Sequence, residues 1–218
     1  MNQMTKSDLI GLTDVAAKIP QFMTKMPHLI TGLKQAYLRT PNTPAGLGLA
    51  FEKAVHRNPH GCALMFEDQQ YSYLQLNAWA NQIAHYYLSI GARKGDVIAV
   101  MLENRPELIA SVIGLAKIGV IAALVNTAQV AKVLAHSINL VKPIAVIVGE
   151  ECRQAVADIR QELELAENRL YWFADQNTRT DTGTAPEGFQ NLAQCIASFP
   201  SFNPATTQSV QGKDGLFY

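Results

Sequence analysis

Short apolar runs alternate with segments of helical periodicity between residues 72 and 148, and this alternation limits the chain to few folds. The runs 97–102, 121–125 and 144–148 are rich in Val, Ile and Ala and too short for helices, which is typical of buried parallel strands. A fourth run, 170–173, follows further along the chain. The order strand, helix, strand predicts an α/β fold in which a parallel sheet is flanked by helices and the crossovers are right-handed.

Residues that start and stop helices support these boundaries. Ser72 and Gln75 have the spacing of a capping box, and Gly91 follows where that helix is expected to end. Pro106 suits the first position of the next helix, and Gly119 suits its end. One face of the helix after Ser72 carries the residues expected in the core: Leu76, Trp79, Ile83, Tyr87 and Ile90.

The N-terminal segment 1–39 has apolar residues at spacings of three and four, interrupted by Pro20 and Pro27. We expect an amphipathic helical arm made of two or three short helices or of one kinked helix. Because its polar face is mildly basic, two roles are open. The arm packs on protein, either its own or a second subunit of a homo-oligomer, or it contacts the inner face of a membrane peripherally. Residues 40–48 are turn-rich and are expected to form a linker.

The segment 49–218 is expected to hold the α/β subdomain and several smaller elements around the sheet. These are a helix at 49–56, a hairpin of 62–67 with 71–73, a charged amphipathic helix at 150–167, a polar mobile loop at 175–188 and a short helix at 189–197.

Charge and cysteine content narrow the functional classes. The net charge is +0 and the pI about 7.0, which gives no support to a nucleic-acid partner. The cysteines Cys62, Cys152 and Cys195 are widely spaced, as expected of reduced thiols in a cytoplasmic protein. No apolar run approaches the ~18 residues of a spanning helix.

The short motifs of serine hydrolases, P-loop nucleotidases and zinc enzymes are absent from the sequence. Gly114 and Gly119 have P-loop spacing, but Val120 stands where the lysine is needed. His56 and His60 have no further ligands nearby, so we expect no metal site.

Polar residues follow two of the expected strands, at the edge where ligands bind in open α/β sheets. Asn104 and Arg105 come after the first strand, and Asn126 and Thr127 come after the second. Two interpretations are open for the first pair. Either Asn104 or Arg105 helps to line a ligand site, or Asn104 satisfies backbone groups at the turn into the next helix. No catalytic, cofactor-binding or metal-binding residue is assigned beyond these four candidates at the edge of a site.

The stretch GARKGDVIAVMLENRPELIASVIGLAKIGVIAALVN resembles the N-terminal region of the acyl-adenylate-forming enzymes, the AMP-dependent synthetases and ligases. Within that superfamily, ENRPE followed by GLAKIGVIAALVNT is most similar to long- and very-long-chain fatty acyl-CoA synthetases of the fatty acid transport protein type. The resemblance extends over residues 47–218.

The resemblance implies an ATP-dependent acid–thiol ligase that uses a fatty acid, ATP, Mg²⁺ and CoA. It also implies that the phosphate-binding loop, the ribose-binding Asp and the catalytic Lys would lie beyond Tyr218. We therefore expect 49–218 to be the N-terminal subdomain of such a ligase, truncated before the phosphate loop and inactive by itself.

Two other classes of protein are considered. A non-catalytic scaffold or partner-binding fragment would keep the fold without the site. A nucleotide-binding oxidoreductase would need a glycine fingerprint after the first or second strand, and neither place has one.

Overall fold

The computed structural model describes residues 12–38, 40, 42–174, 184–211 and 214, and it divides into two compact units, Met1–Asn42 and Thr43–Tyr218. Each unit is described by itself. The expected loop at 175–188 falls largely outside the described residues, as do residues 215–218. None of the described helices is both long and apolar enough to cross a membrane.

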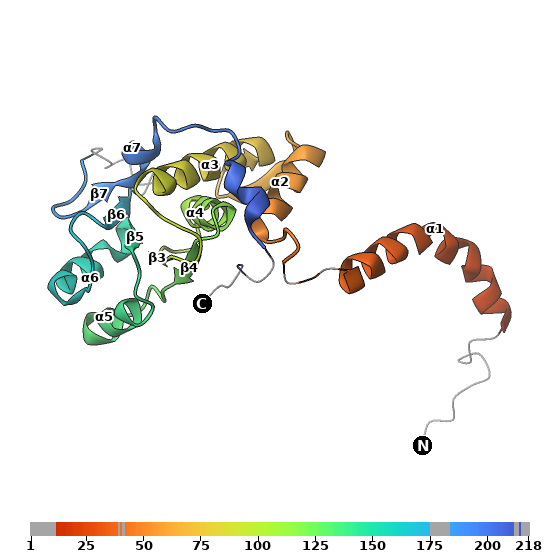
Figure 1. Ribbon diagram of the computed structural model, residues 1–218, viewed down its shortest axis with the longest axis horizontal. Helices are drawn as coiled ribbons and strands as arrows, with labels where there is room; N and C mark the ends of the chain where they lie inside the picture. The colour runs from red at the N-terminus through yellow and green to blue at the C-terminus, as the bar shows by residue number, and fades with distance from the viewer. Residues whose placement is uncertain (1–11, 39, 41, 175–183, 212–213, 215–218) are drawn as a thin grey trace, which may run out of the picture. The chain divides into compact units, whose positions relative to one another are not determined.

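The first unit contains one continuous helix, α1 (Leu12–Leu38), with Pro20 and Pro27 inside it. The expectation of two or three short helices was therefore wrong, whereas the alternative of a single bent helix agrees with the curved ribbon of α1 in Figure 1. Each proline removes a backbone donor and its ring crowds the preceding turn, which bends a helix without ending it.

The second unit is built on a parallel sheet, as predicted. Among the described residues this sheet has five strands in the order β4-β3-β5-β6-β7, and each neighbouring pair is parallel. The strands are β3 (Val97–Met101), β4 (Ile121–Leu124), β5 (Ala145–Gly149), β6 (Leu170–Phe173) and β7 (Gln190–Asn191). Because β4 and β5 lie on opposite sides of β3, the chain reverses its direction across the sheet at β3. The carboxyl ends of the strands around β3 therefore form a topological switch point, where ligands bind in such sheets.

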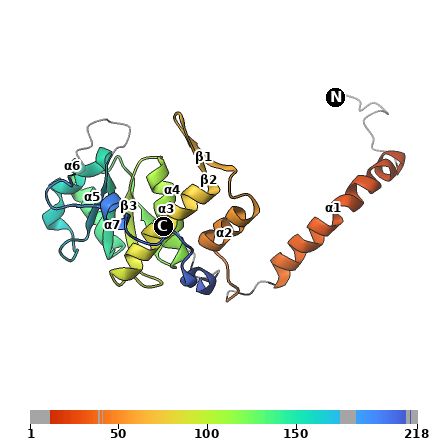
Figure 2. The same cartoon turned by 90° about the horizontal axis from the view of Figure 1, so that it is seen from above.

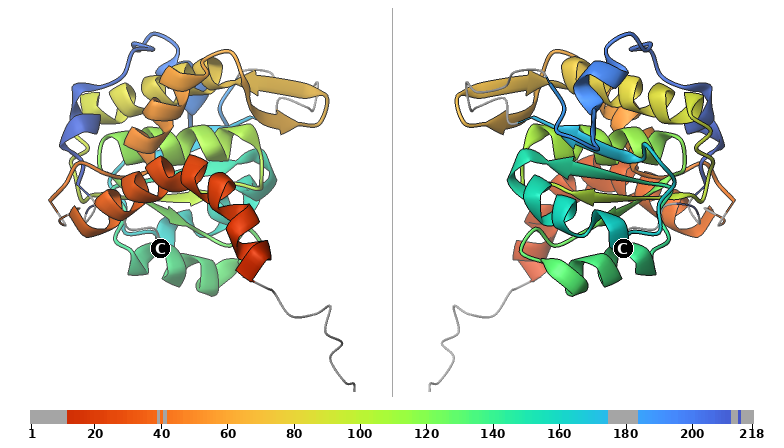
Figure 3. Two further views of the ribbon diagram at one scale, coloured as in Figure 1. Left: turned by 90° about the vertical axis from the view of Figure 1, so that its right-hand side faces the viewer. Right: turned by 90° about the vertical axis from the view of Figure 1, so that its left-hand side faces the viewer.

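Helices cover both faces of the sheet (Figure 3). The helices are α2 (Leu47–Arg57), α3 (Tyr73–Ser89), α4 (Pro106–Lys117), α5 (Ala131–Leu140), α6 (Arg153–Asp158) and α7 (Leu192–Ile196). Val100 and Ile147 belong to the core cluster with residues of α3, α4 and α7. Ala99 and Val146 belong to a second cluster with residues of α5 and α6. This alternation follows from the period of two along a strand, which sends neighbouring side chains to opposite faces.

The helix boundaries confirm the local signals in the sequence. The Gln75 backbone N–H donates to Ser72 Oγ at 3.2 Å and the Ser72 N–H donates to Gln75 Oε1 at 2.8 Å, which completes the capping box of α3. Gly91, directly after the cap of α3, has a φ of 93°. Pro106 occupies the first turn of α4, and Gly119 after it has a φ of 71°. These left-handed conformations suit glycine, which lacks a Cβ.

The smaller elements agree with the expectations in part. The hairpin pairs β1 (Cys62–Phe66) with β2 (Gln69–Ser72) in antiparallel fashion, and it extends from the α/β core in Figure 2. The helix α2 begins at Leu47, so the last two residues of the expected linker 40–48 belong to it. Gly48 is needed there because a Cβ would lie 2.8 Å from the Cα of Lys117 in α4.

The expected charged helix at 150–167 was wrong. The segment contains a 3-10 turn at Glu150–Cys152, the short α6, and a second 3-10 turn at Arg160–Glu162. Beyond the end of α6, the Asn139 side chain bonds two backbone groups of this segment, since its Nδ2 donates to the Glu162 carbonyl at 2.8 Å and its Oδ1 accepts from the Glu164 N–H at 3.0 Å. These backbone groups would otherwise be free to extend the helix.

The short helix expected at 189–197 begins later, at Leu192. Gln190 and Asn191 pair with β6 as the edge strand β7, and the Asn191 side chain then accepts from the Gln194 N–H at 3.2 Å to cap α7.

Candidate functional site at the carboxyl ends of the strands

A pocket of about 500 Å³ lies at the carboxyl ends of β3 and β4. Its apolar lining residues come from these strands and from α4, and its polar ones come from the loops that follow the strands. They are Val100, Leu102, Glu103, Asn104, Leu108, Leu124, Val125, Asn126 and Thr127. Three of the four candidate residues from the sequence are therefore brought together around one cavity.

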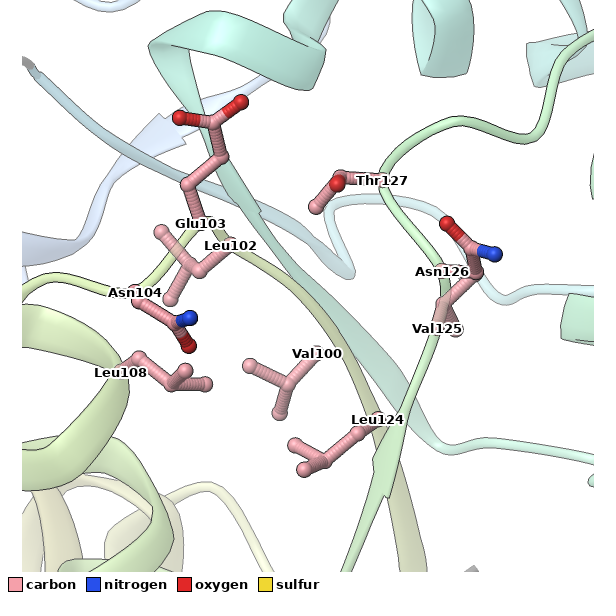
Figure 4. Close-up of a pocket in the computed structure, with 9 residues that line it drawn as sticks. All are labelled: Val100, Leu102, Glu103, Asn104, Leu108, Leu124, Val125, Asn126 and Thr127. Carbon is pink, nitrogen blue, oxygen red and sulfur yellow. The ribbon is translucent and has the colours of Figure 1, made fainter.

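Figure 4 shows how these side chains are arranged. Val100, Leu108 and Leu124 lie together in the apolar part of the pocket, with the amide of Asn104 beside Leu108. Asn126 and Thr127 lie across the pocket, in the loop that follows β4, and the carboxylate of Glu103 points away from the apolar part. The pocket therefore offers an apolar surface with amide and hydroxyl groups around it.

A tight turn fixes the two residues after β4. The Asn126 Oδ1 accepts from the Ala128 N–H at 2.9 Å, and the Gln129 N–H donates to the Asn126 carbonyl at 3.1 Å. The side-chain oxygen of Asn126 is therefore used in the turn itself. Among the described residues, by contrast, the Asn104 side chain makes no hydrogen bond. Its expected role in satisfying the turn before α4 therefore has no support in the geometry.

Arg105 lies outside this pocket. It is buried, with its Nη2 donating to the Phe173 carbonyl at 3.1 Å. Its Nη1 is 3.5 Å from Glu151 Oε2, and its Nε is 3.5 Å from Glu107 Oε2. Arg105 thus links the ends of β3, β5 and β6, and it borders a separate cavity of about 200 Å³ beneath the hairpin.

The groups at these strand ends limit what the site can bind or catalyse. Glu103 is the one charged residue among the pocket's lining residues, with no Lys, Arg or His. No group of three or more His, Cys, Asp or Glu in the described part of the chain could hold a metal ion.

Burial, followed by the charges of Glu151 and Glu103, raises the pKa of the nearby Cys152 thiol to about 11, so the thiol is protonated at neutral pH.

A second polar cluster, absent from the expectations, surrounds Lys117 at the end of α4. The Lys117 side chain is 0% exposed. Its Nζ donates to Glu52 Oε1 at 3.0 Å, to Asn77 Oδ1 at 2.8 Å and to Asn203 Oδ1 at 3.1 Å. Asn81 joins the cluster, donating to Asn203 Oδ1 at 3.0 Å. The one sequence signal was a lysine directly after a largely apolar stretch, at the end of the helix. Because the cluster lies at the opposite end of α4 from the pocket, it supports the fold rather than the site.

The open parallel sheet, with helices on both faces and a pocket at its switch point, defines the class of open-sheet α/β proteins. The model of one family, described as AMP-binding enzyme, matches residues 51–213. The chain belongs to this family, and it corresponds to the N-terminal portion of its members.

Curated relatives agree with this assignment. The medium/long-chain fatty-acid–CoA ligase FadD6 of Mycobacterium tuberculosis is 32% identical over 209 residues, which are 96% of this chain and 32% of the ligase. Long-chain fatty acid transport protein 1 of Rattus norvegicus is 36% identical over 115 residues, which are 52% of this chain and 18% of that protein. The chain thus spans a third or less of the length of these relatives.

Solved structures share the fold. The anthranilate CoA ligase AuaEII in complex with anthranoyl-AMP aligns with a TM-score of 0.68 at 19% identity, over 78% of this chain and 31% of that chain. The N-terminal domain of FACL13 from Mycobacterium tuberculosis aligns with a TM-score of 0.63 at 23% identity, over 79% of this chain and 41% of that chain. The sheet and the small hairpin are therefore those of the N-terminal domains of adenylate-forming enzymes.

Proposed function

We propose that residues 49–218 are the N-terminal subdomain of an AMP-forming fatty acid–CoA ligase that acts on long or very long acyl chains in the cytoplasm. The support is the similarity to FadD6, whose name includes medium- and long-chain acids, and to the long-chain fatty acid transport proteins. ATP, Mg²⁺ and CoA are the cosubstrates and cofactor that the whole ligase would use.

The reaction of such a ligase has two steps. A fatty acid carboxylate oxygen attacks the α-phosphorus of ATP, and the bond to pyrophosphate breaks to give acyl-AMP. The CoA thiolate then attacks the acyl carbon, and AMP leaves with the electron pair of the broken carbon–oxygen bond. No residue of this chain is assigned a role in either step.

We infer that these 218 residues alone do not form acyl-AMP, and the observation that carries this is the lining of the pocket at β3 and β4. A triphosphate is held by Lys, Arg or rows of backbone N–H groups. The pocket has a carboxylate, two amides and a hydroxyl, and no cation. The side chains that line this pocket therefore do not fit MgATP.

Thermal unfolding with and without millimolar MgATP tests this inference. A ligand that binds only the folded state stabilises it by RT ln(1 + [L]/Kd), so a site with an affinity near the ligand concentration would raise the melting temperature measurably. We expect no shift for the 218-residue chain. A shift that saturates with MgATP, and that Asn104→Ala or Thr127→Ala reduces, would show that a nucleotide site exists in this subdomain.

The preference for long acyl chains has its own test. The test uses a chimera in which these residues are followed by the downstream two thirds of FadD6. The chimera should make acyl-CoA from palmitate and longer acids faster than from acetate. FadD6, assayed in parallel, should show the same preference. A chimera that prefers short acids while FadD6 prefers long ones would contradict the assignment.

A further inference from the structure

The apolar residues of α1 lie on one side of the helix. At about 100° per residue they fall within an arc of about 120°. The members of this apolar stripe are Ile19, Phe22, Met23, Met26, Leu29, Ile30 and Leu33. All except Met26 are between 46% and 57% exposed. Thr24 and Thr31 lie on the opposite side.

The charges of this part of the chain have one sign. Lys18 and Lys25 are exposed and, seven residues apart, lie next to each other along one edge of the stripe. The sequence from residue 15 to residue 51 contains no Asp or Glu, but it contains Lys18, Lys25, Lys34 and Arg39. The chain as a whole has a net charge of +0, so this segment is net positive while the rest of the chain is net negative.

Outside the chain itself, two surfaces could cover the stripe, a second copy of α1 or a lipid surface, and the charges favour the lipid. Two copies of α1 paired through their stripes would bring lysines near lysines, with no carboxylate after Asp14 to compensate. An anionic lipid surface satisfies both parts of the helix. Apolar side chains enter the acyl region, and lysine stems run along the stripe with their ammonium groups among the headgroup phosphates.

We propose that α1 is an interfacial helix that binds, in the plane of the bilayer, to a membrane rich in anionic lipid. Its exposed stripe is inserted below the headgroups, and Lys18 and Lys25 lie at headgroup level. The proposal is independent of the ligase assignment.

The test is flotation of the full 218-residue chain with vesicles of phosphatidylcholine and phosphatidylglycerol in equal parts, compared with vesicles of phosphatidylcholine alone. The decisive variant is Met23→Asp with Ile30→Asp, on the stripe. Its matched control is Thr24→Asp with Thr31→Asp, which has the same charge change and the same spacing on the opposite side. Circular dichroism with vesicles absent compares the helix content of the two variants.

We expect the chain to bind the anionic vesicles and to bind neutral vesicles far more weakly. The stripe variant should bind at least about a hundredfold more weakly than the unmodified chain, since two apolar side chains no longer enter the lipid. The affinity of the control for anionic vesicles should fall by no more than about tenfold. Replacing Lys18 and Lys25 by Gln should lower the affinity for anionic vesicles about fivefold for each lysine, without changing the affinity for neutral vesicles.

Three results would overturn the proposal. The first is no binding to anionic vesicles by the unmodified chain. The second is an equal loss in the stripe variant and its control at equal helix content, because attraction of net charge alone would then explain binding. The third is self-association, with lipid absent, that the stripe variant abolishes, because a second copy would then cover the stripe.

Discussion

Replacing Lys117 by Met should lower the free energy of unfolding by about 3–5 kcal/mol, because a buried carboxylate would lose its cation. The Glu52 side chain is 9% exposed and the Lys117 side chain 0%, with 3.0 Å between Oε1 and Nζ. Met nearly preserves the length of the side chain, so little of the loss comes from a cavity. Urea titrations monitored by circular dichroism measure this change in the free energy of unfolding.

A matched surface variant separates burial from charge in this experiment. Arg153 also forms an ion pair, with Glu150, but the two side chains are 33% and 37% exposed. Arg153→Met should therefore cost under about 1 kcal/mol. If Lys117→Met were as mild as Arg153→Met, the account of the buried cluster would be refuted.

Combining substitutions and varying pH tests the cluster further. Glu52→Gln with Lys117→Met should cost less than the sum of the two single changes, since each removes the partner that the other leaves unpaired. Burial lowers the pKa of Lys117 below its usual 10.5, while Glu52 opposes this. The unfolded chain therefore binds more protons between the folded-state pKa and about 10.5, and the contribution of Lys117 to stability rises with pH across that window. The loss in free energy of unfolding caused by Lys117→Met should therefore also increase with pH across that window.

Three further predictions concern packing and association. Leu115→Ala, at a position 0% exposed, should lower the free energy of unfolding by about 2–5 kcal/mol in urea titrations, and a loss under about 0.5 kcal/mol would contradict the assigned helix face. Gly114→Ala should destabilise instead of giving the gain of about 1 kcal/mol usual for this change in a helix, because its Cβ would lie 2.6 Å from the Ala80 carbonyl; increased stability would refute the close approach of α3 and α4. The chain should self-associate in analytical ultracentrifugation through the exposed face of α5, and Val133→Asp with Leu140→Asp, at positions 62% and 69% exposed, should keep it monomeric; unchanged association would exclude that face.

The sheet could be predicted from the sequence because its signals are local. The helices α3 and α4 start at residues whose chemistry suits that position, the Ser72 cap and Pro106. Strands β3, β4, β5 and β6 are short apolar runs of the length that buried strands require, whereas the polar edge strand β7 has no such signal. Asn104, Asn126 and Thr127 could be placed near one another because parallel strands end at the same edge of the sheet.

The remaining features depend on contacts between distant residues. The backbone groups of Glu162 and Glu164 are bonded by the side chain of Asn139, which lies in an earlier helix. Arg105 is bonded to Phe173 in β6 and paired with Glu151 in the turn after β5, and both residues follow much later in the chain. The partner Asn203 lies 86 residues beyond Lys117. The spacing of apolar residues along one sequence does not predict polar contacts between residues so far apart in the chain.

ATP–pyrophosphate exchange with palmitate, measured on the pure 218-residue chain, tests the central claim most directly. Acyl-AMP formation needs phosphates held in place, an aligned carboxylate and stabilised developing charge. The strand ends here provide amides, a hydroxyl and a carboxylate around an apolar pocket. We predict exchange no faster than in a control without protein, while intact FadD6 assayed beside it is active. Exchange above that control, reduced by Asn104→Ala or Thr127→Ala, would show that these residues contain the adenylation site and would contradict the account.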